Sequence, residues 1–497
     1  MSQGPSKGTL WGHPQGLYVL FTTEMWERFS YYGMRALLVL TLVAATESLN
    51  PGFGMSQGDA LKLYGYYTGL VYFTPLLGGW LADNYLGQRK SILIGGILMA
   101  AGQFTLFAAT PHSIDLFYVG LGLIIAGNGL FKPNISTIVG DLYPQGDARR
   151  DSAFSIFYMG INLGAFLAPF VTSTLGESAD YGWRWGYFAA GVGMTLAVVT
   201  QLMLFQRFLG DIGKVPGAQQ DKLNAGGVKK PLTKVEFDRL RVIMFLFVFV
   251  TVFWLAFEQA GGLMNIYAQD YTDRMLGDTE IKAGYFQSLN PLFILLFAPV
   301  FSVLWVALHK RDKSPDAPIK IFAGLVLTAI GFMFLIFGLY EIQLYGKANM
   351  MWLVLAYLFH TLGELCISPV GLSLMTKLAP LRLASLVMGI WFLMPAIASF
   401  LAGLVGAFSE NAAGYTFSHQ VAAAIGLAPE YSGLLMVFGG VGVGLLLFAV
   451  VLWLISGMLV RWMHGAERMQ PTSVEQGIDQ ELGSIAEHEG LGEQAKK

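Results

Sequence analysis

Acidic, basic and aromatic residues are interspersed in one short stretch, residues 24–35 (EMWERFSYYGMR), inside the first long apolar segment. If this stretch is helical, successive residues turn by about 100°, and four side chains then share one face. Those side chains are Glu24, Arg28, Tyr31 and Arg35. A charged group facing lipid costs about 2.5 to 3.5 kcal/mol, so we expect this face to line protein or a water-filled cavity.

Seven charged residues lie well inside apolar segments, away from the segment ends. Four are carboxylates (Glu24, Glu27, Glu258 and Glu364) and three are cations (Arg28, Arg35 and Lys132). In a site that excludes water, the carboxylate in excess could hold a proton, and the sequence leaves open which one it is. His360 is another candidate for carrying the proton, because it precedes Glu364 by four residues on the same helix face. The favoured interpretation, however, is a core histidine whose polar atoms are satisfied by its neighbours.

Depth along the helices, at about 1.5 Å per residue, places these charges in two layers. Arg35 and Glu258 fall at a similar level in the outer half, where an ion pair between them could close the outer end. Lys132 and Glu364 fall a little inside the middle and are the corresponding candidates for the inner end. The alternative is that each pair statically braces the fold. A pair that joins two moving halves must break, however, which favours gating.

The composition is that of an integral membrane protein. Apolar residues make up 54% of the 497 and charged residues 13%, with a mean hydropathy of +0.54, whereas soluble domains carry about 25% charged residues. The net charge of −2 argues against a nucleic-acid partner. Cys366, the one cysteine, is expected to pack as a small apolar residue. The first segment has no small-residue cleavage site, so we expect an uncleaved helix rather than a signal peptide.

Twelve apolar segments are long enough to cross the roughly 30 Å of hydrocarbon in a bilayer. They lie near residues 16–45, 60–82, 90–110, 115–140, 153–175, 184–208, 241–268, 283–308, 318–341, 350–375, 384–408 and 431–461. Lys and Arg gather in the loops that follow the even-numbered segments, which places both termini in the cytoplasm. The expected fold class is all-α, with twelve transmembrane helices in two six-helix bundles.

These segments divide the chain into five parts. We expect a cytoplasmic N-terminal tail (1–15), a first bundle (16–208), a cytoplasmic linker (209–240), a second bundle (241–461) and an acidic cytoplasmic tail (462–497). Gly95 and Gly102 in the third segment recur 229 residues later as Gly324 and Gly331 in the ninth. This pattern favours an internal repeat, with a substrate site between the repeats near the middle of the membrane.

Three motifs narrow the class further. Residues 78–90 (GGWLADNYLGQRK) resemble the charged loop between helices two and three of the major facilitator superfamily. Residues 24–33 (EMWERFSYYG) resemble the ExxERFxYYG signature of the proton-dependent oligopeptide transporters, and residues 154–164 (FSIFYMGINLG) match that family's fifth-helix signature. The resemblance runs from the first helix to Trp391 and implies the major facilitator fold.

The resemblance also implies roles for particular residues. It assigns proton coupling to Glu24, Glu27, Arg28 and Lys132. It implies a peptide-binding site formed by Arg28, Tyr31, Arg35, Tyr72, Lys132, Tyr158, Asn162, Trp254, Asn290, Glu364, Ser368 and Trp391. Two features depart from the family. The linker is too polar to supply the two additional helices of many bacterial members, and the second helix lacks the histidine that takes part in proton coupling in animal members.

A di- or tripeptide suits these side chains because it is a zwitterion with a short amide backbone. Arg28, Arg35 and Lys132 could bind its carboxylate, and Glu364 its ammonium group. We therefore expect a proton-coupled symporter that imports di- and tripeptides across the bacterial inner membrane by alternating access, a multi-pass protein in contact with lipid. We expect protons as the coupling ion and no other cofactor, metal, nucleic acid or obligate protein partner.

Two alternatives remain open at the level of sequence. One is a related proton symporter for nitrate or another small acid. The other is a membrane sensor that no longer transports, against which the retention of both gate pairs and every coupling residue counts. An enzyme is disfavoured because the helices carry no His/Glu metal motif and no nucleophile constellation.

Overall fold

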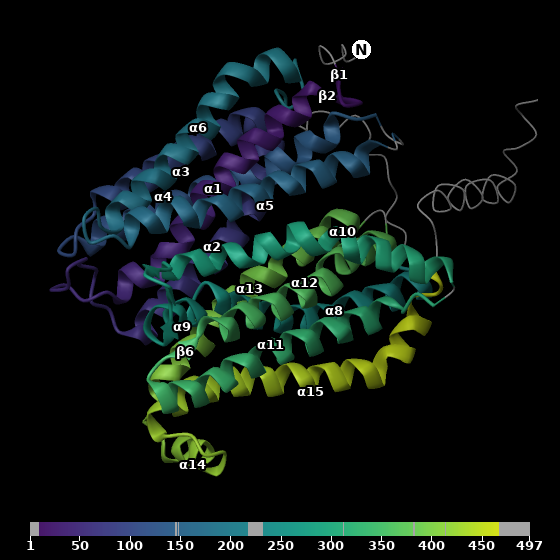
Figure 1. The fold of residues 1–497 in the computed structure, drawn as a ribbon. Helices are drawn as coiled ribbons and strands as arrows, with labels where there is room; N and C mark the ends of the chain where they lie inside the picture. Colours follow the sequence, from purple (N-terminus) through teal and green to yellow (C-terminus); the bar gives the residue numbers. More distant parts are fainter. Residues whose placement is uncertain are drawn as a thin grey trace, which may run out of the picture.

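Two bundles of long helices form the protein in a computed structural model that describes residues 9–144, 147, 149–216, 232–311, 313–380, 383–412 and 414–466. The first bundle contains α1 (Gln15–Val43), α2 (Gln57–Leu81), α3 (Gln88–Ala108), α4 (Ile114–Asp141), α5 (Arg149–Gly176) and α6 (Trp183–Leu209). The second contains α8 (Lys234–Phe257), α10 (Leu289–Lys310), α11 (Ala317–Tyr345), α12 (Met350–Leu378), α13 (Ala384–Ala412) and α15 (Ser432–Trp462). In Figure 1 the purple and blue helices of the first bundle lie above the green and yellow helices of the second.

Shorter elements connect these helices. A π-helical turn, η1 (Ala82–Leu86), precedes α3, and three 3-10 turns are η2 (Glu258–Ala260), η3 (Ala283–Ser288) and η5 (Pro429–Tyr431). Two short helices are α9 (Leu263–Asp270) and α14 (Thr416–Ala424). Six two-residue strands pair as β1 (Thr9–Leu10) with β2 (His13–Pro14), β3 (Thr272–Asp273) with β6 (Ala348–Asn349), and β4 (Met275–Leu276) with β5 (Thr279–Glu280).

Ten helical segments within the described ranges are long and apolar enough to cross a membrane, and α1 and α2 are not among them. The reason in α1 is its charge, because every 18-residue window of this helix contains at least three of Glu24, Glu27, Arg28 and Arg35. In α2 the many tyrosine and glycine residues lower the hydropathy. Both helices nevertheless pack within the first bundle, α1 against α5 and α6 and α2 against α4.

The seventh expected segment, 241–268, differs from the prediction of one continuous helix. α8 begins earlier, at Lys234, where Thr233 and Glu236 form a capping box. The helix then ends at Phe257, and η2 with two glycines separates it from α9. A Cβ on Gly261 would lie 2.0 Å from the Tyr64 hydroxyl, so the break lets the backbone approach α2 closely. Glu258 therefore lies in a turn rather than within a helix.

The two tails and the linker fall largely on residues outside the described ranges, namely 1–8, 217–231 and 467–497. Of the expected N-terminal tail, the structure describes the β1–β2 pair and the first residue of α1. α14, on the loop between α13 and α15, was not anticipated from the sequence. Its nine residues are too few to cross a bilayer.

Close glycine packing recurs in the two bundles. A Cβ on Gly95 of α3 would lie 2.5 Å from the Gly127 carbonyl oxygen of α4. A Cβ on Gly324 of α11 would lie 2.8 Å from the Gly363 carbonyl oxygen of α12. The α3–α4 and α11–α12 pairs are thus packed in the same way, at positions related by a similar shift along the chain.

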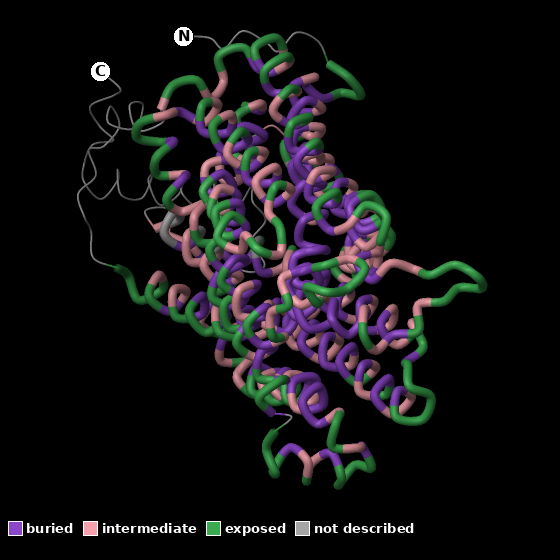
Figure 2. The backbone as a smooth tube through the Cα atoms, turned by 90° about the vertical axis from the view of Figure 1, so that its left-hand side faces the viewer, coloured by how far each residue is buried: buried purple, intermediate pink, exposed green. Residues whose placement is uncertain are grey.

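Exposed apolar side chains cover the outer faces of the bundles. Figure 2 shows buried residues concentrated in the interior of the helix packing, with exposed residues on the outer faces and loops. Leu202, Val303 and Leu454 are 61%, 70% and 68% exposed. Exposed apolar faces along long helices are typical of surfaces that contact lipid.

The glycine contact generates a prediction for stability. Val at position 95 would press against the Gly127 carbonyl and force α3 and α4 apart, an overpacking that costs about 1 to 3 kcal/mol. Gly95→Val should therefore lower the thermal unfolding midpoint in detergent, measured by tryptophan fluorescence. Gly122→Val on α4 is the matched control, because a Cβ there meets nothing within 4 Å. Equal midpoints for the two variants would contradict the packing argument.

Candidate functional site

A small cavity of about 140 Å³ lies between the two bundles. The first bundle contributes side chains from α1, α2 and α5, and the second contributes them from α8, η2, η3, α10 and α12. Seven residues predicted for the peptide site line it, namely Arg35, Tyr72, Tyr158, Asn162, Trp254, Asn290 and Glu364. Part of the predicted peptide site therefore lines a cavity that both bundles form.

On the inner side of this cavity, α1 carries a buried charge cluster. The Arg28 Nε lies 3.1 Å from Glu24 Oε1 and also donates to Glu27 Oε2. All three side chains are almost fully buried. Asn128 of α4 donates to Glu27 Oε1 over 3.4 Å. The one-turn spacing of Glu24 and Arg28 explains their contact, because residues four apart are neighbours on a helix.

Two polar atoms of the cluster lack a hydrogen-bond partner among the described residues, namely Glu24 Oε2 and Arg28 Nη2. Most buried polar groups in proteins are paired, so unpaired ones at a cavity call for an explanation. A carboxylate oxygen can take a proton, and a guanidinium N–H can bind a carboxylate. The cluster is thus able to exchange a proton and to hold an anionic group.

Lys132 and Glu364, the predicted inner gate, are not brought into an ion pair within the described part of the chain. The Lys132 ammonium lies 4.4 Å from the centre of the Tyr72 ring. Glu364 instead accepts a hydrogen bond from Asn290 over 2.8 Å. In this structure each of the two charges therefore has a neighbour other than its predicted partner.

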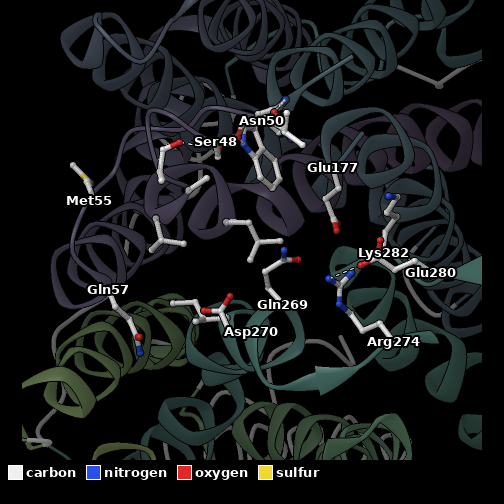
Figure 3. Close-up of a pocket in the computed structure, with 17 residues that line it drawn as sticks. Ser48, Asn50, Met55, Gln57, Glu177, Gln269, Asp270, Arg274, Glu280 and Lys282 are labelled. Atoms are coloured by element: carbon white, nitrogen blue, oxygen red, sulfur yellow. Dashed lines mark hydrogen bonds and ion pairs between the residues drawn. The ribbon is translucent and has the colours of Figure 1, made fainter. Parts of the chain in front are cut away.

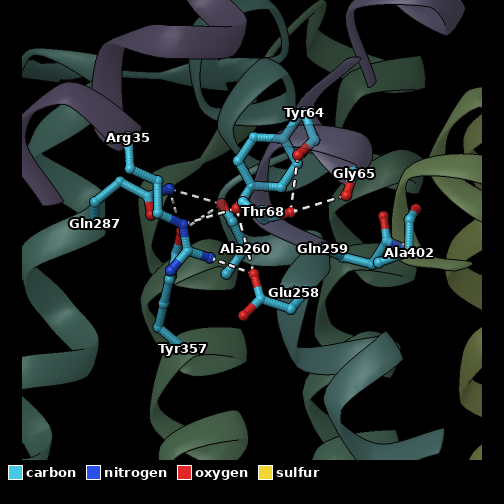
Figure 4. A network of polar contacts seen from close by, with 10 residues as sticks. All are labelled: Arg35, Tyr64, Gly65, Thr68, Glu258, Gln259, Ala260, Gln287, Tyr357 and Ala402. Atoms are coloured by element: carbon cyan, nitrogen blue, oxygen red, sulfur yellow. Dashed lines mark hydrogen bonds and ion pairs between the residues drawn. The ribbon is translucent and has the colours of Figure 1, made fainter. Parts of the chain in front are cut away.

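The outer pair is closed. Arg35 Nη2 lies 2.7 Å from Glu258 Oε2, and both side chains are buried. The Tyr64 hydroxyl of α2 accepts from Arg35 Nε over 2.7 Å and donates to Glu258 over 3.3 Å. Figure 4 shows the three side chains converging from α1, α2 and η2. Further outward, Asn265 of α9 donates to the Ala36 carbonyl over 2.8 Å, so a second contact joins the bundles there.

His360 does not take part in the site. Its ring packs 4.6 Å from the Phe332 ring, centroid to centroid, and a Cβ on Gly331 would lie 2.4 Å from it. Both neighbours belong to α11, whereas Glu364 contacts Asn290 of α10. The two residues thus face different helices, and the position of His360 agrees with the core interpretation.

Other predicted residues lie beside the cavity rather than in its lining. Trp391 packs against α12, where a Cβ on Gly371 would lie 2.4 Å from its ring. The hydroxyls of Tyr31 and Ser368 are buried and have no hydrogen-bond partner among the described residues. The α1 cluster of Glu24, Glu27 and Arg28 and the α4 residue Lys132 are likewise not part of the lining.

Sequence reasoning missed four polar or aromatic residues of the lining, namely Tyr32, Phe257, Gln287 and Tyr357. Tyr32 is part of the YYG motif and could have been found there. Gln287 donates to the Ala260 carbonyl and to the Tyr357 hydroxyl, over 2.6 and 3.0 Å. Neither of these two residues stands out in the sequence, because uncharged polar residues are common near helix ends.

Within the described residues, no group of three or more His, Cys, Asp or Glu side chains is arranged to hold a metal ion. The side chains that line the cavity offer charges, hydrogen-bonding groups and aromatic rings. Such a set can bind a zwitterion and exchange protons.

The two bundles, the cavity between them and the buried charges define a multi-pass membrane transporter. More specifically, the chain belongs to the POT family, whose model matches residues 89–208 and 219–420. The sequence resemblance to the proton-dependent oligopeptide transporters is thereby confirmed.

Individual relatives agree with this assignment. The chain is 38% identical to the transporter YclF of Bacillus subtilis, over 93% of this chain and 97% of that protein. It is 36% identical to the peptide transporter YePEPT of Yersinia enterocolitica, over 81% of this chain and 89% of that protein. A crystal structure of peptide transporter POT in complex with sulfate is similar with a TM-score of 0.80 and 35% identity, covering 92% of this chain and 97% of that one. A POT family transporter in complex with 5-aminolevulinic acid has a TM-score of 0.78 and 29% identity, covering 92% and 98%.

The outer network generates a second prediction. Tyr64→Phe removes the hydroxyl that bonds both Arg35 and Glu258 and leaves the Arg35 Nε without that acceptor. Hydrogen bonds to charged groups contribute about 1.5 to 3 kcal/mol, so the free energy of unfolding should fall by that amount. Tyr66→Phe, on the exposed side of the same helix, should be neutral. Denaturant unfolding of both variants tests this, and a neutral Tyr64→Phe would show that the hydroxyl does not support the ion pair.

Proposed function

We propose that this protein is a proton-coupled symporter that imports di- and tripeptides across the bacterial inner membrane by alternating access. The observation that carries the proposal is the cavity with opposite charges on its two sides. Arg28 and Lys132 belong to the first bundle and Glu364 to the second. The relatives named as peptide transporters support the same substrate class.

We further propose that all twelve long helices span the membrane, with both termini in the cytoplasm. α1 and α2 are included despite their polarity, because their polar side chains turn inward. Glu24, Arg28 and Arg35 are all buried. The concentration of Lys and Arg in the loops after the even-numbered helices supports the orientation. In this orientation, the Arg35–Glu258 pair closes the external side.

A peptide would lie across the cavity with its carboxylate toward Arg28 and Lys132 and its ammonium group toward Glu364. The unpaired Arg28 Nη2 gives the carboxylate a donor without breaking an existing bond. Asn162 and Asn290 would bind the peptide backbone. The side chains of the peptide would contact the remaining residues of the predicted site, namely Tyr31, Arg35, Tyr72, Tyr158, Trp254, Ser368 and Trp391.

Such a peptide would also draw the two bundles together at the inner end. Lys132 and Glu364 belong to different bundles and hold separate partners here. A zwitterion placed between them contacts both, which favours closure of the inner side. Lys132 and Glu364 would pair directly when that side is closed.

Proton coupling would act through the α1 cluster. Protonation of Glu24 or Glu27 removes a negative charge from Arg28 and frees the guanidinium for the peptide carboxylate. Binding of proton and peptide would therefore reinforce each other. No other cofactor and no obligate protein partner is needed for this scheme.

Uptake into proteoliposomes tests the substrate and the charge assignment together. The wild type should accumulate a dipeptide when an inward proton gradient is imposed. Glu364→Gln should raise the KM for the dipeptide at least tenfold, because a buried ammonium group loses its charged partner, a cost of about 1.5 to 3 kcal/mol. Glu47→Gln, an exposed carboxylate on the outer surface, is the control and should transport like the wild type.

The same assay separates the alternative solutes. Nitrate has no ammonium group, so a nitrate symporter would not depend on Glu364. If Glu364→Gln transported the dipeptide with an unchanged KM, the peptide orientation would be wrong. Transport of nitrate in place of dipeptide by the wild type would replace the proposal with the alternative of a small-acid symporter.

A further inference from the structure

Glu177 follows the last residue of α5 and reaches across to the second bundle. Its two carboxylate oxygens accept hydrogen bonds from the backbone N–H groups of Ala283 and Gly284, over 2.7 and 2.8 Å. These two residues begin the helical segment Ala283–Lys310, made of η3 and α10. The first N–H groups of a helix have no partner within the helix, so Glu177 satisfies two of them.

Glu410, near the end of α13, makes the mirror contact. Its Oε2 accepts from the backbone N–H of Gly58, the second residue of α2, over 2.5 Å. Beside it, Gln57 donates to the Ser409 hydroxyl over 3.1 Å. Here a carboxylate of the second bundle binds the start of a helix in the first, whereas Glu177 does the reverse.

The two contacts occupy equivalent positions in the two halves. Glu410 follows Glu177 by 233 residues, close to the 229-residue shift between the glycine pairs of α3 and α11. Ala283 follows Gly58 by 225 residues. In order along each bundle, α5 corresponds to α13 and α2 to α10. The same device therefore occurs twice, once in each direction.

Each contact also depends on a glycine. A Cβ on Gly58 would lie 2.5 Å from Glu410 Oε2, and a Cβ on Gly284 would lie 1.9 Å from the Ser173 hydroxyl oxygen of α5. The absence of a side chain lets the start of each helix approach the opposite bundle closely. Negative charge at a helix N-terminus is stabilised by the helix dipole as well as by the hydrogen bonds.

The surroundings place both contacts on the outer side of the molecule. Glu177 lines the large outer cavity of about 650 Å³ in Figure 3, near the Arg274–Glu280 ion pair. Below Glu177, Thr174 and Tyr285 are hydrogen-bonded at 2.6 Å, and Ser288 donates to the Phe166 carbonyl over 2.8 Å. The α5–α10 and α2–α13 seams thus hold the bundles together on either side of Arg35 and Glu258.

We propose that Glu177 and Glu410 are two further outer-gate residues, which hold the outside-closed conformation by binding the helix starts of the opposite bundle. Both contacts join parts that must separate when the outer side opens, so both are released in each transport cycle. This inference rests on the proposed alternating-access function and adds gating residues that act independently of Arg35 and Glu258.

Distance measurements between spin labels test the proposal without any transport assay. Labels at Leu49 and Leu344, both highly exposed, would report on the outer ends of the two bundles in a Cys366→Ser background reconstituted in nanodiscs. Glu177→Gln should raise the ratio of the long-distance to the short-distance population about fivefold, since the charge at a helix N-terminus is lost. Glu410→Gln should act in the same direction but less strongly, because this side chain is exposed whereas Glu177 is half-buried.

A control variant and a double variant accompany the two single variants. Glu47→Gln, also on the outer surface, should leave the ratio unchanged, and the double variant should multiply the two single effects. Ratios for both single variants equal to that of Glu47→Gln would overturn the proposal. Glu258→Gln reports separately on the Arg35–Glu258 pair and should also raise the ratio. If Glu258→Gln alone kept the wild-type ratio, the proposed gate of Arg35 and Glu258 would be contradicted and the roles of Glu177 and Glu410 would remain supported.

Gly58→Ala provides a second route for the α2–α13 contact. The added methyl group would push Glu410 away from the Gly58 N–H, so this variant should raise the ratio as Glu410→Gln does. Gly122→Ala, where a Cβ meets nothing within 4 Å, is its control and should behave as the wild type. A wild-type ratio for Gly58→Ala would contradict the proposed role of Glu410.

Discussion

The ion pair between Arg35 and Glu258 is the interaction on which this conformation depends. Removing two charges from water is costly, and their attraction compensates only when the geometry is good and further hydrogen bonds satisfy them. Tyr64 supplies such bonds to both partners. The pair comes from different bundles, so its formation requires the outer ends to meet. The outer closure of the molecule follows from this requirement.

The same helix that supplies Arg35 carries the Glu24, Glu27 and Arg28 cluster about 10 to 16 Å further in, at about 1.5 Å per residue. α1 packs against α5 and α6 and contacts α9 of the opposite bundle. A rigid helix that joins the inner cluster to the outer pair transmits a tilt at one end to the other. Under the proposed function, α1 would couple protonation of the cluster to the outer pair.

The inner side is arranged differently from the outer side. Lys132 lies over Tyr72, and Glu364 is held by Asn290, so each charge has a stabilising neighbour in this structure. Each residue has one set of partners in this state and a candidate partner across the cavity in the other. Two alternative sets of contacts of this kind are what a bistable transporter requires.

Much of the fold was predictable from the sequence because lipid imposes long apolar helices, and charges within them are rare enough to mark the site. The outer pair could be anticipated from helix depth alone, since Arg35 and Glu258 fall at the same level. The break after Phe257 could not, because an apolar run with two glycines is compatible with a continuous helix. The helix that His360 contacts could not be predicted either. Both α10 and α11 lie beside α12, and the sequence does not say which of them a given face of α12 meets.

Whether Lys132 and Glu364 form an ion pair in this conformation could not be predicted from the sequence either. Opposite charges at equal depth indicate that Lys132 and Glu364 can meet, but not whether they do so in a given conformation. The contacts of Glu177 and Glu410 could not be predicted for another reason. Their hydrogen-bond donors are backbone N–H groups, which every residue except proline carries and which leave no mark in a sequence.

We propose that a carboxylate of the α1 cluster carries the coupled proton. The test compares two modes of transport in proteoliposomes, namely gradient-driven dipeptide accumulation and exchange of labelled for unlabelled dipeptide without a gradient. A Glu24→Gln,Glu27→Gln double variant should lose accumulation and retain exchange, because binding and alternation persist when the proton can no longer be carried. Accumulation by this variant at the wild-type level would contradict the account.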